Sequence, residues 1–198
     1  AIVLALGPVD GRLAALDLII ESEHGPDSGA FLVTDDVETA QTSVAALETH
    51  WAAMDRQRAG WSRTVIGGPR GGVLLAEDAD AAIAFCNAYA PEHLQILAPD
   101  PFDWLDRIEH AGEILLGSHT PSTLGNFVLG PSHVLPTGGW AKTASAPSVH
   151  DFMKRTTVAH VSAGGYPALA ADARAIAEYE GFDGHARAVS SVRDDLLR

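Results

Sequence analysis

Five short apolar runs alternate with segments of helical periodicity in the first part of the chain. The runs lie at 1–6, 30–33, 72–76, 94–97 and 113–116. The helical segments lie between them, at about 10–23, 37–58, 79–89 and 101–110. Strands that are apolar along their whole length and alternate with helices are typical of a parallel sheet covered by helices on both faces. The pattern therefore predicts an α/β fold.

The pattern changes after residue 117. About twenty residues from there on are rich in Gly, Pro, Ser and Thr without periodicity, and ordered loops of this length in compact domains are usually functional. Helical segments are expected at about 148–162 and 166–198, the second broken near Gly181. We therefore expect a partial α/β catalytic domain over 1–147, with an incomplete, Rossmann-like parallel sheet, followed by a helical tail over 148–198.

Charge and cysteine content exclude several classes of protein. The formal net charge is −13, from 13 basic and 26 acidic residues, so nucleic acid and anionic membranes are poor partners. The longest apolar stretch, LAALDLII, carries Asp17 and is too short to span a membrane. Cys86 stands alone in an apolar helical pattern, which indicates a small buried side chain and a reducing compartment. We therefore expect a cytoplasmic protein.

A dinucleotide-binding fingerprint is absent from the sequence. The glycines of GGPRGG at 67–72 have the wrong spacing and precede a strand instead of following one. Turn formation explains these glycines, and no residue is assigned to a cofactor.

Glu92 and His93 lie side by side in APEHL, between a proline and an apolar run. An imidazole titrates near neutrality, and a carboxylate held between a proline and a strand can be desolvated enough to act as a base. The pair therefore indicates acid–base catalysis. The alternative is an incidental exposed pair at the entry of a strand.

Two further histidines follow glutamates at short spacing. His24 follows Glu21 by three residues near a helix end, so both side chains project from one face, and Glu-x-x-His is a spacing found among metal ligands. His185 follows Glu180 by five residues at the break in the tail. Both histidines can equally be residues that cap a helix end.

Four blocks carry a resemblance to a known family. The blocks are NAYAPEHLQI, AGEILLGSHTPSTLGNFVLGPSHVLPTGG, SVHDFMKRTTVAHVS and AEYEGFDGHARAVS. In order and spacing they are similar to the C-terminal half of the histidinol dehydrogenases, which depend on zinc and NAD. A chain that starts in a strand agrees with this, and we expect the N-terminal half of the parent enzyme to be a missing partner.

The resemblance implies a four-electron oxidation of L-histidinol to L-histidine through histidinal, with two NAD molecules used in succession. His93 would take the hydroxyl proton as hydride leaves, and Glu92 would activate the water that adds to the aldehyde. We expect this chain alone to be inactive.

The resemblance also implies a zinc site shared across a homodimer. Its ligands would be Glu21, His24 and Asn126 of one subunit and His185 of the other. The family has glutamine at position 21 and aspartate at position 126, so the acid and the amide are exchanged here. The exchange keeps the formal charge of the ligands and moves it across the site.

Substrate contacts follow from the same resemblance. His133 and Glu180 match positions that contact the polar end of the substrate, and a carboxylate at Glu180 suits the cationic amine of an amino alcohol. The further substrate contacts implied are His24, His93, Asn126 and His185. Two alternatives stay open. One is a related zinc dehydrogenase for another alcohol such as sulfopropanediol, and the other is a non-catalytic module that dimerises.

Overall fold

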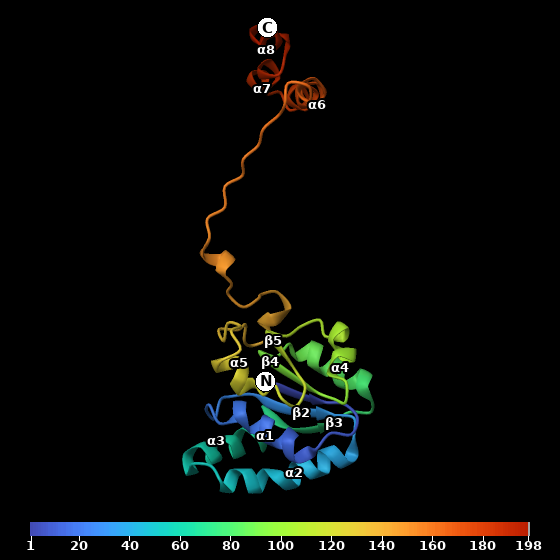
Figure 1. The fold of residues 1–198 in the computed structure, drawn as a ribbon, viewed down its shortest axis with the longest axis vertical. Coiled ribbons are helices and arrows are strands. Elements are labelled where there is room, and N and C mark those ends of the chain that lie inside the picture. The colour runs from blue at the N-terminus through green and yellow to red at the C-terminus, as the bar shows by residue number, and fades with distance from the viewer. Residues whose placement is uncertain (198) are drawn as a thin grey trace. The chain divides into compact units, whose positions relative to one another are not determined.

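The computed structural model describes residues 1–197 and divides into two compact units. The first is Ala1–Phe152 and the second begins at Met153. Figure 1 shows the sheet and its helices in the first unit and a group of helices in the second.

The first unit is built on a five-stranded parallel sheet of order β3-β2-β1-β4-β5. Its strands are β1 (Ile2–Ala5), β2 (Ala30–Thr34), β3 (Gly71–Leu75), β4 (His93–Leu97) and β5 (Glu113–Leu116). Each strand coincides with one of the five apolar runs, so the predicted α/β class is confirmed. The strand order reverses on either side of β1, as in doubly wound folds.

Helices cover both faces of the sheet, as Figure 1 shows. They are α1 (Gly11–Ser22), α2 (Val37–Ala52), α3 (Arg56–Ile66) and α4 (Ala79–Tyr89). Successive residues of a strand point to opposite faces, so Val3 of β1 packs with α1 and α3 while Leu4 packs with α4. Cys86 lies in the second of these cores, where burial raises the pKa of its thiol to about 12. This agrees with the expected small buried side chain.

Aspartates begin the helices and explain one difference from the sequence-based expectation. Asp10, Asp36, Asp55 and Asp78 each accept a hydrogen bond from a backbone N–H in the first turn of the helix that they precede. The prediction of a single helix over 37–58 is wrong, because α2 ends at Ala52 and Asp55 caps the start of a second helix, α3. The segment expected as helix at 101–110 is a 3₁₀ helix, η1 (Pro101–Arg107).

The loop-rich region after β5 contains three short elements, α5 (Ser122–Phe127), η2 (Trp140–Lys142) and η3 (Val149–Phe152). The helix expected over 148–162 is wrong, since only η3 forms there and residues 153–162 have no regular structure. Thr156, Thr157 and Val158 lose side-chain freedom in a helix, and all of residues 153–162 are exposed, so no apolar face is buried to stabilise one.

The second unit contains α6 (Tyr166–Tyr179), α7 (Asp183–Ala188) and α8 (Ser191–Leu196). The expected break lies at Gly181, whose φ of +74° is in the left-handed region that glycine adopts without cost. Helix α6 buries Ala170 and Ala177 and leaves Leu169 and Ile176 exposed. No helix within residues 1–197 is long and apolar enough to cross a membrane.

Candidate active site

A pocket of about 1150 Å³ opens in the first unit at the amino edge of the sheet. Its lining includes residues that precede or begin strands, such as Gly29 before β2 and His93 in β4, together with the carboxyl end of α4. Six of the eight predicted site residues line this pocket: Glu21, His24, Glu92, His93, Asn126 and His133. The fold thus brings together side chains from α1, β4, α5 and the loop that follows α5.

The turn before β4 positions the Glu92–His93 pair. Ala90 caps the carboxyl end of α4; its φ of +53° is left-handed and its N–H donates to the carbonyl of Cys86 at 2.9 Å. Pro91 follows, and the chain enters β4 directly at His93. His93 is 5% exposed, so it is not the solvent-facing histidine of an incidental surface pair. Glu92 is half-buried and lines the same pocket.

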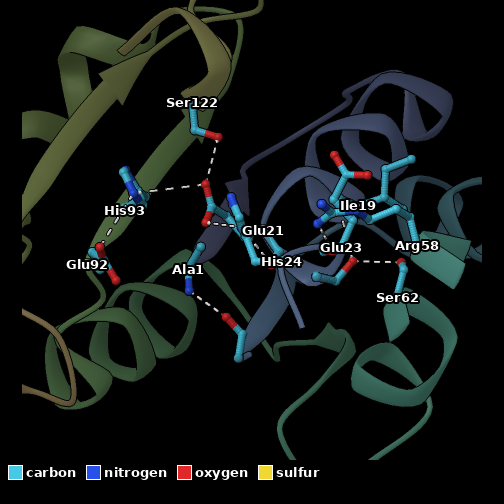
Figure 2. A network of polar contacts seen from close by, with 12 residues as sticks. Ala1, Ile19, Glu21, Glu23, His24, Arg58, Ser62, Glu92, His93 and Ser122 are labelled. Atoms are coloured by element: carbon cyan, nitrogen blue, oxygen red, sulfur yellow. Dashed lines mark hydrogen bonds and ion pairs between the residues drawn. The ribbon is translucent and has the colours of Figure 1, made fainter. Parts of the chain in front are cut away.

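Three carboxylates surround the imidazole of His93. Its Nε2 lies 3.9 Å from Oε1 of Glu21 and 3.8 Å from Oε1 of Glu92, as Figure 2 shows. Its Nδ1 lies 3.0 Å from Oε2 of Glu113. Glu113 is not among the residues predicted from the sequence. The available signal was an acidic residue that opens the apolar run EILL at the start of β5.

The carboxyl end of α1 supplies Glu21 and His24. Oε2 of Glu21 lies 3.3 Å from Nδ1 of His24, and the hydroxyl of Ser122 donates to Oε1 of Glu21 at 3.1 Å (Figure 2). The last turn of α1 contains no basic residue, so the partial negative charge of the helix end adds to the carboxylate. This wall of the pocket therefore favours a cation.

The region that follows β5 contributes three further residues to the pocket lining, Asn126, His133 and Lys142. Asn126 is half-buried, whereas His133 and Lys142 are exposed. No sequence pattern indicates Lys142, since it is a single lysine in a loop-rich region. Its side chain brings a positive charge into a lining that also contains carboxylates and imidazoles.

The donors in the pocket fit the chemistry of zinc, which accepts imidazole nitrogen together with carboxylate and amide oxygen. Glu21, His24 and Asn126 provide one donor of each kind. Within residues 1–197 no three His, Cys, Asp or Glu side chains are arranged to hold a metal ion, and the third donor here is an amide.

The remaining two predicted site residues lie in the second unit. Glu180 and His185 line a pocket of about 410 Å³ with Phe182, whose ring centroid is 5.3 Å from that of His185. Their relation to the first pocket stays a prediction.

Doubly wound folds usually bind the pyrophosphate of a dinucleotide at the amino end of the helix after β1. In this chain the carboxylate of Asp10 caps α1 there, and its hydrogen bonds with Arg12 lower its pKa to about 2. Asp10 and Arg12 form an ion pair at this position. No residue of this chain is assigned to NAD.

Comparisons with known proteins identify the family of this chain. The family model described as histidinol dehydrogenase matches residues 1–193. The chain is 53% identical over 197 residues to histidinol dehydrogenase homolog 2 of Mesorhizobium japonicum, and 42% identical over 197 residues to histidinol dehydrogenase of Synechocystis sp.. Each match covers 100% of this chain and 45% of the relative.

The fold is also that of a solved relative. The crystal structure of histidinol dehydrogenase from Elizabethkingia anophelis matches with a TM-score of 0.88 at 28% sequence identity, over 100% of this chain and 45% of that one. The chain therefore spans a little under half the length of these relatives. A family match over nearly every residue and a shared fold lead to one conclusion: the chain belongs to the histidinol dehydrogenase family.

Proposed function

We propose that this chain forms the zinc-binding, acid–base part of an NAD-dependent dehydrogenase that oxidises L-histidinol to L-histidine through histidinal. One observation carries the proposal: Nε2 of the buried His93 faces the pocket between the carboxylates of Glu21 and Glu92. Because the chain spans only 45% of its relatives, turnover requires the remainder of the protein.

The two proton transfers are assigned to adjacent residues. His93 is placed to accept the hydroxyl proton of an alcohol in the pocket through Nε2. Glu92 is half-buried, so water can reach its carboxylate, and it activates the water that adds to the aldehyde. Both steps take place at one carbon atom, which explains why the two residues are neighbours. The nicotinamide cofactor, when bound, would supply the hydride acceptor.

The zinc ligands we propose are Glu21, His24 and Asn126, with His185 of the partner subunit as the fourth in a homodimer. The proposal is supported by the shared pocket of the first three residues and by the negative carboxyl end of α1. Zinc, when bound, would supply Lewis acidity to the polar groups of a substrate in the pocket. The free, buried Cys86 supports a reducing, cytoplasmic location.

Two features bear on the substrate. Glu21 and Glu92 in the pocket favour the cationic amine of histidinol, as does a carboxylate at Glu180 if it reaches the pocket in the dimer. Lys142 in the same lining instead favours an anionic group, and the relative of higher identity is called a homolog of histidinol dehydrogenase. Oxidation of an anionic alcohol such as sulfopropanediol is therefore the second candidate.

An assay of the intact protein that carries this sequence separates the candidates. The zinc-loaded protein is mixed with NAD and either histidinol or sulfopropanediol, and NADH formation is followed. We expect turnover with histidinol, and a loss of about 10²–10⁴-fold in kcat for His93→Asn. The exposed Glu109→Gln serves as a control and keeps full activity. Turnover with the sulfonate alone supports the second candidate, and no turnover with either leaves a non-catalytic module.

A further inference from the structure

We propose that Glu113 is a positioning residue that holds the proton of His93 on Nδ1 and so leaves Nε2 as the basic nitrogen that faces the pocket. The catalytic meaning of this inference rests on the proposed function. The tautomer itself follows from contacts within the chain.

Sheet register places the two side chains opposite one another. His93 and Glu113 are Cα partners in the parallel pairing of β4 with β5, so their side chains leave the sheet on the same face. The resulting distance from Nδ1 to Oε2 is 3.0 Å. The backbone N–H of Glu113 also donates to the carbonyl of Glu92 at 2.9 Å, which ties the catalytic pair to the start of β5.

Burial makes this contact obligatory for the carboxylate. The side chains of His93 and Glu113 are 7% and 9% exposed. Among residues 1–197, His93 is the only cationic or imidazole side chain within ion-pair distance of Glu113. A buried carboxylate without a donor is strongly disfavoured, so the proton of a neutral imidazole is drawn to Nδ1.

Gly125 of α5 leaves room for the carboxylate. A Cβ added at Gly125 would lie 2.9 Å from Oε1 and 3.0 Å from Oε2 of Glu113. Any side chain at this position would push the carboxylate away from its present place. The helix that carries Asn126 is therefore packed directly against the group that orients His93.

The two nitrogens of His93 then have separate tasks. Nδ1 donates to Glu113, while Nε2 keeps its lone pair and lies within 4 Å of Glu21 and Glu92. Orientation of a histidine by a carboxylate on its other nitrogen is a general device for fixing the tautomer that accepts a proton. With the opposite tautomer, Nε2 carries a proton and the lone pair points into the protein.

Four variants test the inference: Glu113→Gln, Glu113→Asp, Gly125→Ala and, as a matched control, Glu109→Gln. Glu109 is an exposed glutamate beside a histidine, with a side chain 73% exposed. Gly125→Ala changes neither His93 nor Glu113, and it favours a helix, so it gives a second test if Glu113→Gln fails to fold.

The first readout is the tautomer of His93, from the ¹⁵N shifts of its ring in the intact protein at a pH where imidazoles are neutral. We expect the proton on Nδ1 in wild type, Glu113→Asp and Glu109→Gln. A shift of the proton toward Nε2 is expected in Glu113→Gln and Gly125→Ala. A proton on Nε2 in wild type, or an unchanged tautomer in both Glu113→Gln and Gly125→Ala, would overturn the inference.

The second readout is steady-state kinetics. We expect kcat to fall about 10–100-fold in Glu113→Gln with KM little changed, since groups that orient a reactive side chain typically contribute this much. Glu113→Asp should recover part of the loss. Gly125→Ala should add nothing in the Glu113→Gln background, because both act on the same carboxylate. If the wild type shows no turnover, the proposed function fails while the ring shifts still decide the inference.

Discussion

At the scale of single residues, two buried carboxylates lie near the candidate active site, Glu113 and Asp17. Glu113 is compensated by an imidazole, and Asp17 of α1 by the amide of Gln95, which donates to Oδ2 at 2.7 Å. Asp17 is 5% exposed, and burial raises its pKa to about 6 despite the opposing effect of that hydrogen bond. An amide stabilises a buried carboxylate less than a cation does, so the ionised form of Asp17 should lower the free energy of unfolding measurably.

The Asp17 carboxyl predicts a pH dependence of stability with a defined sign. Its pKa is about 6 in the folded chain and about 3.9 in an unfolded one, so the folded state holds the proton more tightly. Its contribution to stability is therefore full below about pH 4 and is lost as the pH rises through about 6. Asp17→Asn keeps an acceptor for Gln95 and should exceed wild type by roughly 1–2 kcal/mol near neutrality.

Urea unfolding of wild type and Asp17→Asn at several pH values checks this prediction. The difference between the two proteins removes the contributions of all other titrating groups. Asp106→Asn, at an exposed position in η1, is the control and should track wild type at every pH. A stability difference between wild type and Asp17→Asn that stays constant from acid to neutral pH contradicts the assignment.

At the scale of elements, the junction between α4 and β4 determines where the site lies. Ala90 is the only non-glycine residue among 1–197 with a positive φ, and it is 1% exposed. The left-handed turn at Ala90 ends α4 at Tyr89, just before Pro91, and places Glu92 and His93 at the edge of the sheet. A strained residue is thus built into the connection that carries the proposed catalytic pair.

The effect of substitutions at Ala90 on stability should depend on backbone strain and not on helix propensity. Ala90→Val should lower the free energy of unfolding by about 1–2 kcal/mol or more, because a β-branched side chain is disfavoured at positive φ. Ala90→Gly should stay within about 1 kcal/mol of wild type. At the exposed Ala81 inside α4 the order should reverse, with Gly costing more than Val. The same order at both positions in urea unfolding would exclude the strain.

At the scale of the whole molecule, the proposed zinc site depends on an exchange of acid and amide between α1 and α5. If Glu21 and Asn126 compensate one another, the protein binds about one zinc per subunit with Glu21 as the only anionic ligand. Glu21→Gln should weaken zinc binding by at least about 10–100-fold. Adding Asn126→Asp should restore affinity, because the charge returns to the position that the family uses. Equal affinity in all three proteins, measured by competition with a chelator, contradicts compensation.

The proposed fourth ligand, His185, would link the zinc site to dimer formation. We expect a dimer in light scattering at micromolar concentration and a loss of zinc affinity in His185→Ala. When wild-type subunits are mixed with a Glu21→Gln, His185→Ala double variant, zinc affinity should fall in proportion to the fraction of mixed dimers, because each of their two sites lacks a ligand. A monomer that binds zinc with full affinity would contradict a shared site. The exposed Leu169 and Ile176 of α6 are consistent with a surface that packs on another chain.

The five strands of the first unit and its helices α1 and α4 could be predicted because their signals are local. An apolar run of four to six residues indicates a strand that is buried on both faces. An aspartate before a helical segment indicates where the helix begins. The Glu92–His93 pair could be identified from the sequence for the same reason, since both residues lie in one pentapeptide. The helix expected over 148–162 failed because periodicity alone does not show whether an apolar face has anything to pack against.

The partners of His93 were decided only by tertiary structure. Glu113 lies 20 residues from His93, and Ser122 lies 101 residues from Glu21, so both contacts depend on strand register and on the packing of α5. Hydrogen-bond geometry is set by tenths of an ångström, which no spacing along the chain records. The sequence by itself determined the five strands, the family and the adjacency of Glu92 and His93, because these depend on neighbouring residues. Folding alone decided which carboxylate faces which nitrogen, because that depends on how distant strands align.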